Sequence, residues 1–154
     1  MTAVPSQAQA QSAPRSFFGL VPSGDLQADD YRMIQQANIG TNRIPIVWDD
    51  LEVAPDRFGW GPVDRRIGGS ASQGIAVLPV LFGAPWWLAN NPEIPPVGSD
   101  RQKDEWGEFV GRVVRRYGEG GIYWRDVYPV QFPGAQPNPI TTWQIWNEQN
   151  GPKH

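Results

Sequence analysis

Short apolar runs alternate with amphipathic segments along most of this chain. Runs of consecutive apolar residues predict buried strands, and segments with an apolar residue every three or four positions predict helices. The predicted strands are residues 17–21, 42–48, 75–82 and 141–146. Continuous apolar strands that alternate with amphipathic helices are typical of a parallel sheet covered by helices, so the predicted fold class is α/β.

Helices are predicted between consecutive strands. Asp29 is the expected N-cap of the first helix, and Pro62 lies in the first turn of the second. The clearest helix spans residues 102–117 and ends before a glycine. Its apolar positions fall at helical spacing: Trp106, Phe109, Val110, Val113, Val114 and Tyr117. The segments 83–100 and 118–140 follow neither period, and loops of that length are usually functional or disordered.

The spacing of the strands leaves two α/β architectures open. The first three predicted strands start at residues 17, 42 and 75, which matches the roughly 30 residues per unit of a (β/α)8 barrel. A doubly wound open sheet would be favoured by a phosphate-binding glycine motif after a strand. The glycine-rich segment 118–121 follows a helix instead. Nucleotide binding is therefore not expected, and pattern alone does not choose between the open sheet and half of a barrel.

Composition and charge exclude several classes of protein. The chain has 154 residues, too few for a complete barrel of about 250 residues. Its formal net charge is −3, and its one basic cluster (Arg112, Arg115 and Arg116) lies at helical spacing beside acidic residues, as expected of a solvated helix face rather than a nucleic-acid site. The chain has no cysteine and one histidine, His154, so no metal site is expected. No run approaches the roughly 18 apolar residues of a membrane span.

The first 16 residues differ from the rest of the chain. Residues 1–16 are rich in Gln, Ala, Ser and Pro without hydrophobic periodicity, which predicts a flexible arm before a domain at 17–154. Ala8-Gln9-Ala10 has the small-x-small pattern of a signal-peptidase site, but no apolar stretch precedes it. We expect a secreted protein, with the cytoplasm as the alternative.

The candidate chemistry lies at the end of the fourth predicted strand. Asn147 and Glu148 follow the run 141–146, and the carboxyl ends of parallel strands form the active face of α/β proteins. Burial of Glu148 between Trp143 and Trp146 would raise the pKa of its carboxyl toward the range of a general acid. The alternative is a strand-terminal glutamate that caps the next helix.

Three motifs resemble those of the clan A glycoside hydrolases, a large group of retaining (β/α)8 barrels. The second predicted strand reads N-R-I-P-I-V-W, where that clan has x-R-φ-P/D-φ-x-W. The third leads into Pro85-Trp86-Trp87, which matches P-x-W, and residues 143–150 match W-x-x-W-N-E-P-N except that Gln149 replaces proline. The most similar branches are the family 39 xylosidase-like and family 5 cellulase-like enzymes, and the resemblance covers about residues 17–151.

The resemblance implies roles for three polar residues. Glu148 would be the general acid/base, which protonates the glycosidic oxygen and then activates water. Asn147 would hydrogen-bond the 2-hydroxyl of the sugar. Arg43 would lie beneath the site and hold the nucleophilic carboxylate ionised through charge and hydrogen bonding. The substrate would be a glycoside, an oligosaccharide or a polysaccharide, and this chemistry needs no cofactor.

Tryptophans near the same strand ends are candidate sugar contacts. Trp86 and Trp87 would stack on the apolar faces of pyranose rings, with packing on the barrel rim as the alternative. Trp48 ends the second predicted strand and Asp49 and Asp50 follow it. These three would line a subsite, with capping of a helix or loop as the alternative.

The resemblance also implies a missing half. A retaining mechanism needs a second carboxylate about 5–5.5 Å from the first, and in this clan it is a glutamate at the end of the seventh strand. We therefore expect residues 17–154 to be the first four βα units of a TIM barrel, a fragment that is inactive alone. A complementing C-terminal half or a homodimer would cover its open edges. The alternatives are a non-catalytic carbohydrate-binding α/β module and a purely structural α/β domain.

Overall fold

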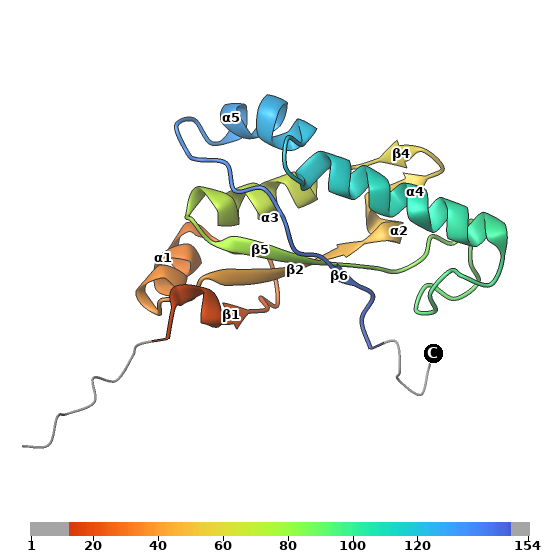
Figure 1. Ribbon diagram of the computed structural model, residues 1–154, viewed down its shortest axis with the longest axis horizontal. Coiled ribbons are helices and arrows are strands. Elements are labelled where there is room, and N and C mark those ends of the chain that lie inside the picture. The colour runs from red at the N-terminus through yellow and green to blue at the C-terminus, as the bar shows by residue number, and fades with distance from the viewer. Residues whose placement is uncertain (1–12, 149–154) are drawn as a thin grey trace, which may run out of the picture.

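The computed structural model describes residues 13–148 and contains a parallel four-stranded sheet (Figure 1). Its strands are β1 (Gly19–Leu20), β2 (Thr41–Val47), β5 (Ala76–Phe82) and β6 (Gln144–Ile145). They lie in the order β1-β2-β5-β6, and every neighbouring pair is parallel. The predicted α/β class is confirmed, and spatial order follows chain order.

The three main helices lie where the apolar periodicity predicts them. They are α1 (Ala28–Gln36), α3 (Gly61–Ser72) and α4 (Asp100–Tyr117). The prediction that Asp29 is the N-cap of α1 is wrong, because Gln27 takes that place and its backbone N–H donates to the Asp30 carboxylate at 2.7 Å. Asp29 instead lies in the first turn and pairs with Arg32.

The outer two strands are shorter than their apolar runs. Only Gly19–Leu20 of the first run pairs with β2, and Arg15–Phe17 form the 3-10 turn η1. Phe17 is 72% exposed. The first apolar run, residues 17–21, is therefore not buried by the described residues, although its composition predicts a buried strand. Residues 1–12 of the predicted arm, and the motif position Gln149, lie outside the described residues.

Short elements form inside segments that the periodicity does not mark. After β2 come α2 (Trp48–Leu51) and a two-stranded antiparallel hairpin of β3 (Glu52–Ala54) and β4 (Arg57–Phe58). The prediction of 118–140 as a loop without secondary structure is wrong for the π-helical turn η2 (Tyr123–Val127) and for α5 (Tyr128–Gln131). These turns are held by buried aromatic rings, since Tyr123 and Tyr128 are both 0% exposed.

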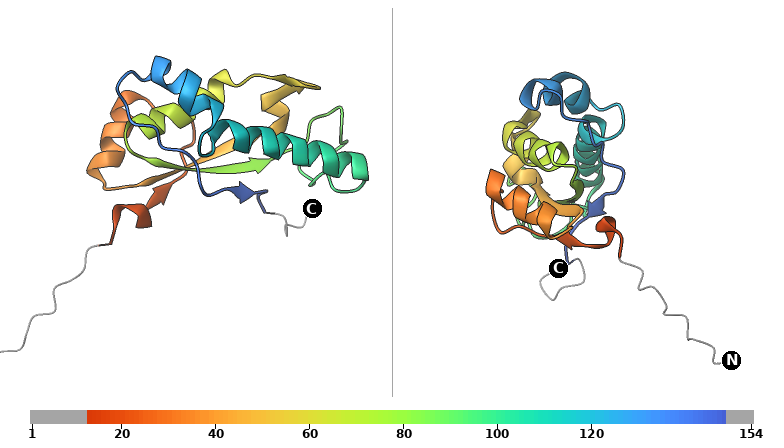
Figure 2. Two further views of the ribbon diagram at one scale, coloured as in Figure 1. Left: turned by 45° about the horizontal axis from the view of Figure 1, so that its top comes forward. Right: turned by 90° about the vertical axis from the view of Figure 1, so that its left-hand side faces the viewer.

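The two faces of the sheet have different surroundings. Figures 1 and 2 show α3, α4, η2 and α5 on one side of it. Along β2, buried and half-buried residues alternate, because side chains of a strand point to opposite faces in turn. Ile44 and Ile46 join the core on the helical side, together with Leu81 of β5. Arg43, Pro45 and Val47 occupy the other face and are half-buried.

A buried ion pair joins α3 to α4. Arg116 donates to both carboxylate oxygens of Asp64, at 2.9 and 2.6 Å, and the Tyr117 hydroxyl donates to the same group at 2.7 Å. The Arg116 guanidinium also lies over the Trp60 ring, 4.8 Å from its centroid. The sequence-based interpretation of Arg112, Arg115 and Arg116 as one solvated face is therefore wrong for Arg116, whose side chain is only 14% exposed.

Burial of Tyr117 makes the fold less stable at alkaline pH. Burial, and then the neighbouring Asp64 charge and hydrogen bond, raise the pKa of the Tyr117 hydroxyl above its usual 10.0. The folded protein therefore holds this proton more tightly than the unfolded chain does. Its contribution to stability is complete below about pH 10 and is lost as the pH rises further, because the unfolded tyrosine ionises first.

We expect the free energy of unfolding to be flat from pH 8 to about pH 10 and to fall above it. In Tyr117→Phe, which lacks the ionisable hydroxyl, the fall is shallower, while Tyr123 and Tyr128, whose pKa values burial also raises, still contribute. Urea unfolding at a series of pH values measures both slopes. Equal slopes in the two proteins would contradict the assignment to Tyr117.

Candidate functional site

Arg43 and Asn147, which two separate motifs supply, meet at the end of the sheet. Arg43 lies on the face of β2 opposite to the core positions Ile44 and Ile46. Its Nε donates to Oε1 of Gln144 at 2.9 Å, and its Nη2 donates to Oδ1 of Asn147 at 2.8 Å. Because β5 lies between β2 and β6, the guanidinium reaches across one strand to make both bonds.

The backbone turns sharply where β6 ends. Trp146 has φ 62° and Glu148 has φ 51°. Residues other than glycine rarely adopt this left-handed backbone conformation. The Trp146 N–H donates to the Leu81 carbonyl at 2.7 Å, and the Gln144 Nε2 donates to the Trp146 carbonyl at 3.0 Å. The Trp146 ring is buried edge-on against Trp106, with 5.6 Å between centroids. Both backbone polar groups and the ring of Trp146 thus hold the turn in place.

Glu148 is exposed on this turn. The expectation that Trp143 and Trp146 bury its carboxyl is not met, because both rings belong to the core on the helical side. Trp146 is 5% exposed beside Trp106, and Trp143 packs against the main hydrophobic cluster. The carboxyl is therefore open to a ligand or to a further protein surface.

The three tryptophans expected to contact sugar differ in exposure. Trp48 is 0% exposed and stacks on Phe109, with 4.9 Å between centroids. A ring without exposed surface cannot stack on a sugar, so this geometry does not support a substrate contact for Trp48. Trp87 is half-buried and leans edge-on against Trp48 at 6.1 Å. Trp86 is 74% exposed and presents its ring to solvent.

Asp49 ties the Trp86 loop to the end of β2. Its Oδ1 accepts the Trp86 backbone N–H at 3.3 Å. Asp49 therefore caps a loop, which was the alternative to lining a subsite. The same bond holds the exposed Trp86 next to the carboxyl end of β2.

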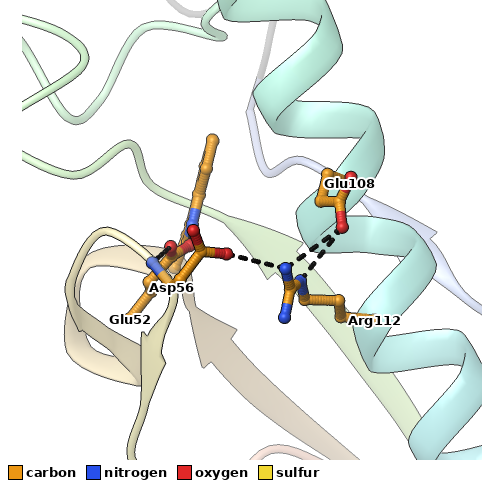
Figure 3. A network of polar contacts seen from close by, with 5 residues as sticks. Glu52, Asp56, Glu108 and Arg112 are labelled. Atoms are coloured by element: carbon orange, nitrogen blue, oxygen red, sulfur yellow. Dashed lines mark hydrogen bonds and ion pairs between the residues drawn. The ribbon is translucent and has the colours of Figure 1, made fainter.

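A polar network fixes the β3–β4 hairpin beside the same strand end (Figure 3). Glu52 is 5% exposed; its Oε2 accepts the Trp48 indole N–H at 2.5 Å and its Oε1 accepts the Asp56 backbone N–H at 2.8 Å. At the surface, Arg112 of α4 donates to Asp56 at 2.7 Å and to Glu108 at 3.2 Å. The buried half of the network links hairpin and core, and the exposed half links hairpin and helix.

Sequence reasoning missed one member of the site, Gln144. It lies between Trp143 and Ile145 on an otherwise largely apolar strand, and a polar residue inside such a strand is a signal for a specific bond. Its two hydrogen bonds connect Arg43 with the Trp146 turn. The motif comparison treated this position as variable, which hid the signal.

Two kinds of feature are absent from residues 13–148. No group of three or more His, Asp or Glu side chains in this part of the chain is arranged to hold a metal ion. No helix there is both long enough and apolar enough to cross a membrane.

Comparisons with known proteins agree with the fold. No family model matches the chain. It is similar to a family 39 glycoside hydrolase from Bacteroides cellulosilyticus WH2, with a TM-score of 0.61 and 18% identity over 86% of this chain and 24% of that one. It is also similar to the β-galactosidase of the psychrophilic Marinomonas ef1, with a TM-score of 0.58 and 19% identity over 85% of this chain and 21% of that one.

These likenesses confirm the resemblance that the motifs indicate, at the level of the fold. The parallel sheet and its helices match part of a glycoside hydrolase structure. The chain spans about a quarter of the first matched protein and about a fifth of the second.

The hairpin network predicts different costs for its buried and exposed members. Glu52→Ala removes the acceptor of a buried indole N–H, so we expect a loss of about 1–3 kcal/mol in the free energy of unfolding. Arg112→Ala removes partly exposed ion pairs, worth about 0–1 kcal/mol. Urea denaturation of both variants measures the difference, and an equal or larger loss in Arg112→Ala would contradict the greater contribution of Glu52.

Proposed function

We propose that residues 17–154 form the first four βα units of a (β/α)8 barrel, the catalytic domain of a retaining glycoside hydrolase. Two observations support this arrangement. The four strands are parallel and lie in chain order, as consecutive strands of a barrel do. The fold matches part of two glycoside hydrolase structures over 86% and 85% of the chain.

The hydrogen bond from Arg43 to Asn147 carries the functional proposal. It joins residues 104 positions apart, each of which is a polar position of a glycoside hydrolase motif. A guanidinium has donors only, so the Asn147 amide must present its oxygen to Arg43 and turn its NH2 away. That NH2 is then a donor for the oxygen of a sugar hydroxyl.

Glu148 takes the role of general acid/base. It gives its proton to the glycosidic oxygen as the bond to the anomeric carbon breaks and a carboxylate nucleophile bonds to that carbon. It then takes a proton from the water that displaces the nucleophile. Its exposed position directly after Asn147 suits a group that must reach a substrate oxygen and later a water molecule.

The nucleophile is proposed to come from outside the described residues. Within residues 13–148, no carboxylate is hydrogen-bonded to Arg43, whose two acceptors there are amide oxygens. A carboxylate delivered to this face would gain from the guanidinium charge and keep a low pKa. A complementing C-terminal half is the proposed source, and a second copy of the chain is the alternative.

The proposed substrate is a glycoside, an oligosaccharide or a polysaccharide, and secretion of the protein remains a prediction. Trp86 supports a carbohydrate substrate, because its 74% exposed ring is a flat apolar surface beside the carboxyl ends of the strands. The same exposure favours the second candidate function, a non-catalytic carbohydrate-binding module. The two are separated by the effect of Glu148 on turnover.

We expect the 154-residue chain alone to show no turnover of aryl glycosides, because no carboxylate of residues 13–148 is hydrogen-bonded to Arg43 as the proposed nucleophile would be. Adding a chain that carries the remaining barrel units should give turnover, and Glu148→Gln should reduce it by about 100-fold or more. Glu119→Gln, at an exposed position after α4, is the matched control. Turnover by the 154-residue chain that depends on Glu148 would contradict the need for a second half.

Sugar binding should depend on Trp86. Titration with xylo- or cello-oligosaccharides is expected to quench tryptophan fluorescence, and Trp86→Ala should remove most of that quenching. Ile94→Ala changes a nearby residue that is 43% exposed and serves as the control. If the protein is a binding module, Glu148→Gln should keep its affinity for the oligosaccharide, and neither protein should show turnover. No quenching, even with the remaining units added, would favour a purely structural domain.

A further inference from the structure

Gln144 uses both ends of its carboxamide at the end of β6. Its oxygen accepts the Arg43 Nε–H at 2.9 Å, and its NH2 donates to the Trp146 carbonyl at 3.0 Å. We propose that Gln144 is a positioning residue, which locks the Arg43 guanidinium and the left-handed turn at Trp146 so that the Asn147 amide is held in one orientation.

The first part of the lock concerns Arg43. Its guanidinium is planar, so a bond at Nε fixes the plane in which the Nη donors lie. With Gln144 holding Nε, the Nη2 donor is aimed at the Asn147 oxygen, which it reaches at 2.8 Å. Without that acceptor the guanidinium could rotate about its side chain, and the Asn147 amide would lose its fixed partner.

The second part concerns the backbone between Gln144 and Asn147. Trp146 adopts φ 62°, a conformation that persists for a bulky residue only when its surroundings determine it. The Gln144 NH2 is the hydrogen-bond donor that the described residues bring to the Trp146 carbonyl. Asn147 follows this carbonyl directly, so the same bond sets the direction in which the Asn147 side chain leaves the strand.

The chemistry of the carboxamide separates Gln144 from its near analogues. Glutamate keeps an acceptor for Arg43 but has no donor for the Trp146 carbonyl when ionised. Leucine keeps the approximate size and loses both bonds. The two variants therefore separate the contact with Arg43 from the contact with the turn.

A purely structural role predicts a different outcome. Gln144 is half-buried, and the bonds of its side chain within residues 13–148 go to Arg43 and Trp146, not to any helix. Its register partner on β5 is Val80. Removing its side-chain bonds should therefore leave the packing between sheet and helices intact while loosening the site.

The test uses NMR on the full chain, with Gln144→Leu, Gln144→Glu and the exposed control Gln36→Leu. We expect Gln144→Leu to speed hydrogen exchange of the Arg43 Nε–H by at least about tenfold, the factor for loss of one net hydrogen bond, and to shift the Asn147 side-chain NH2 signals. Gln144→Glu should keep slow exchange at Arg43 while the Trp146 and Asn147 backbone signals shift. Gln36→Leu should change none of them.

Melting temperature is measured on the same samples. We expect it to stay within a few degrees in all three variants. Unchanged Arg43 and Asn147 signals in Gln144→Leu would overturn the proposal. Signals that change only in step with a general loss of stability would overturn it as well, because they would show a structural role.

The catalytic consequence of this positioning rests on the proposed function and has a separate readout. In the assembled enzyme, Gln144→Leu should lower kcat by about 100-fold with a smaller change in KM, since a displaced catalytic group costs about that factor. The NMR arm needs neither substrate nor turnover. If it succeeds while the assembly shows no glycosidase activity, the positioning stands and the glycoside hydrolase assignment fails. A Gln144→Leu assembly with normal kcat would overturn the catalytic consequence.

Discussion

The contact between Arg43 and the two amides at the end of β6 ties the second strand of the described sheet to its last strand. A guanidinium offers donors and no acceptor, so it imposes one polarity on its neighbours. Gln144 and Asn147 must both turn their oxygens toward it, and their NH2 groups must face elsewhere. The orientation of both side-chain amides at this strand end therefore follows from the placement of one charged side chain on β2.

That placement depends on how the sheet is packed. Ile44 and Ile46 bury one face of β2 against the helices, which leaves Arg43 on the other face with room to cross β5. The helices are in turn held by contacts among the buried rings of Tyr117, Tyr123 and Tyr128 and by the buried pair of Asp64 and Arg116. Apolar burial thus decides which face the arginine occupies, and the polar bonds then decide the geometry of the site.

The sequence predicts what periodicity encodes and little of what tertiary contacts decide. The α/β class and the helix over residues 100–117 follow from apolar patterns, whereas the strand order β1-β2-β5-β6 does not. Periodicity does not mark η2, because a tertiary contact holds it: the Tyr123 hydroxyl donates to the Asp64 carbonyl, 59 positions away. Nor could it separate Trp48 from Trp86, since both lie at or after the end of a strand and the first is covered by Trp106 and Phe109 of α4. Gln144 went unnoticed because its importance lies in Arg43, 101 positions away.

The positive charge of Arg43 determines which kind of group is favoured on this face of the sheet. Within the described residues the guanidinium donates to two neutral amide oxygens, which leave its charge uncompensated. An ionised carboxylate brought to this face gains both a charge and hydrogen bonds, whereas a neutral group gains only the latter. In the proposed barrel, the side that contains Arg43 therefore favours an ionised nucleophile. Glu148, the proposed acid/base, is exposed beyond the turn that Gln144 holds, so its side chain is free to reach a substrate on this face.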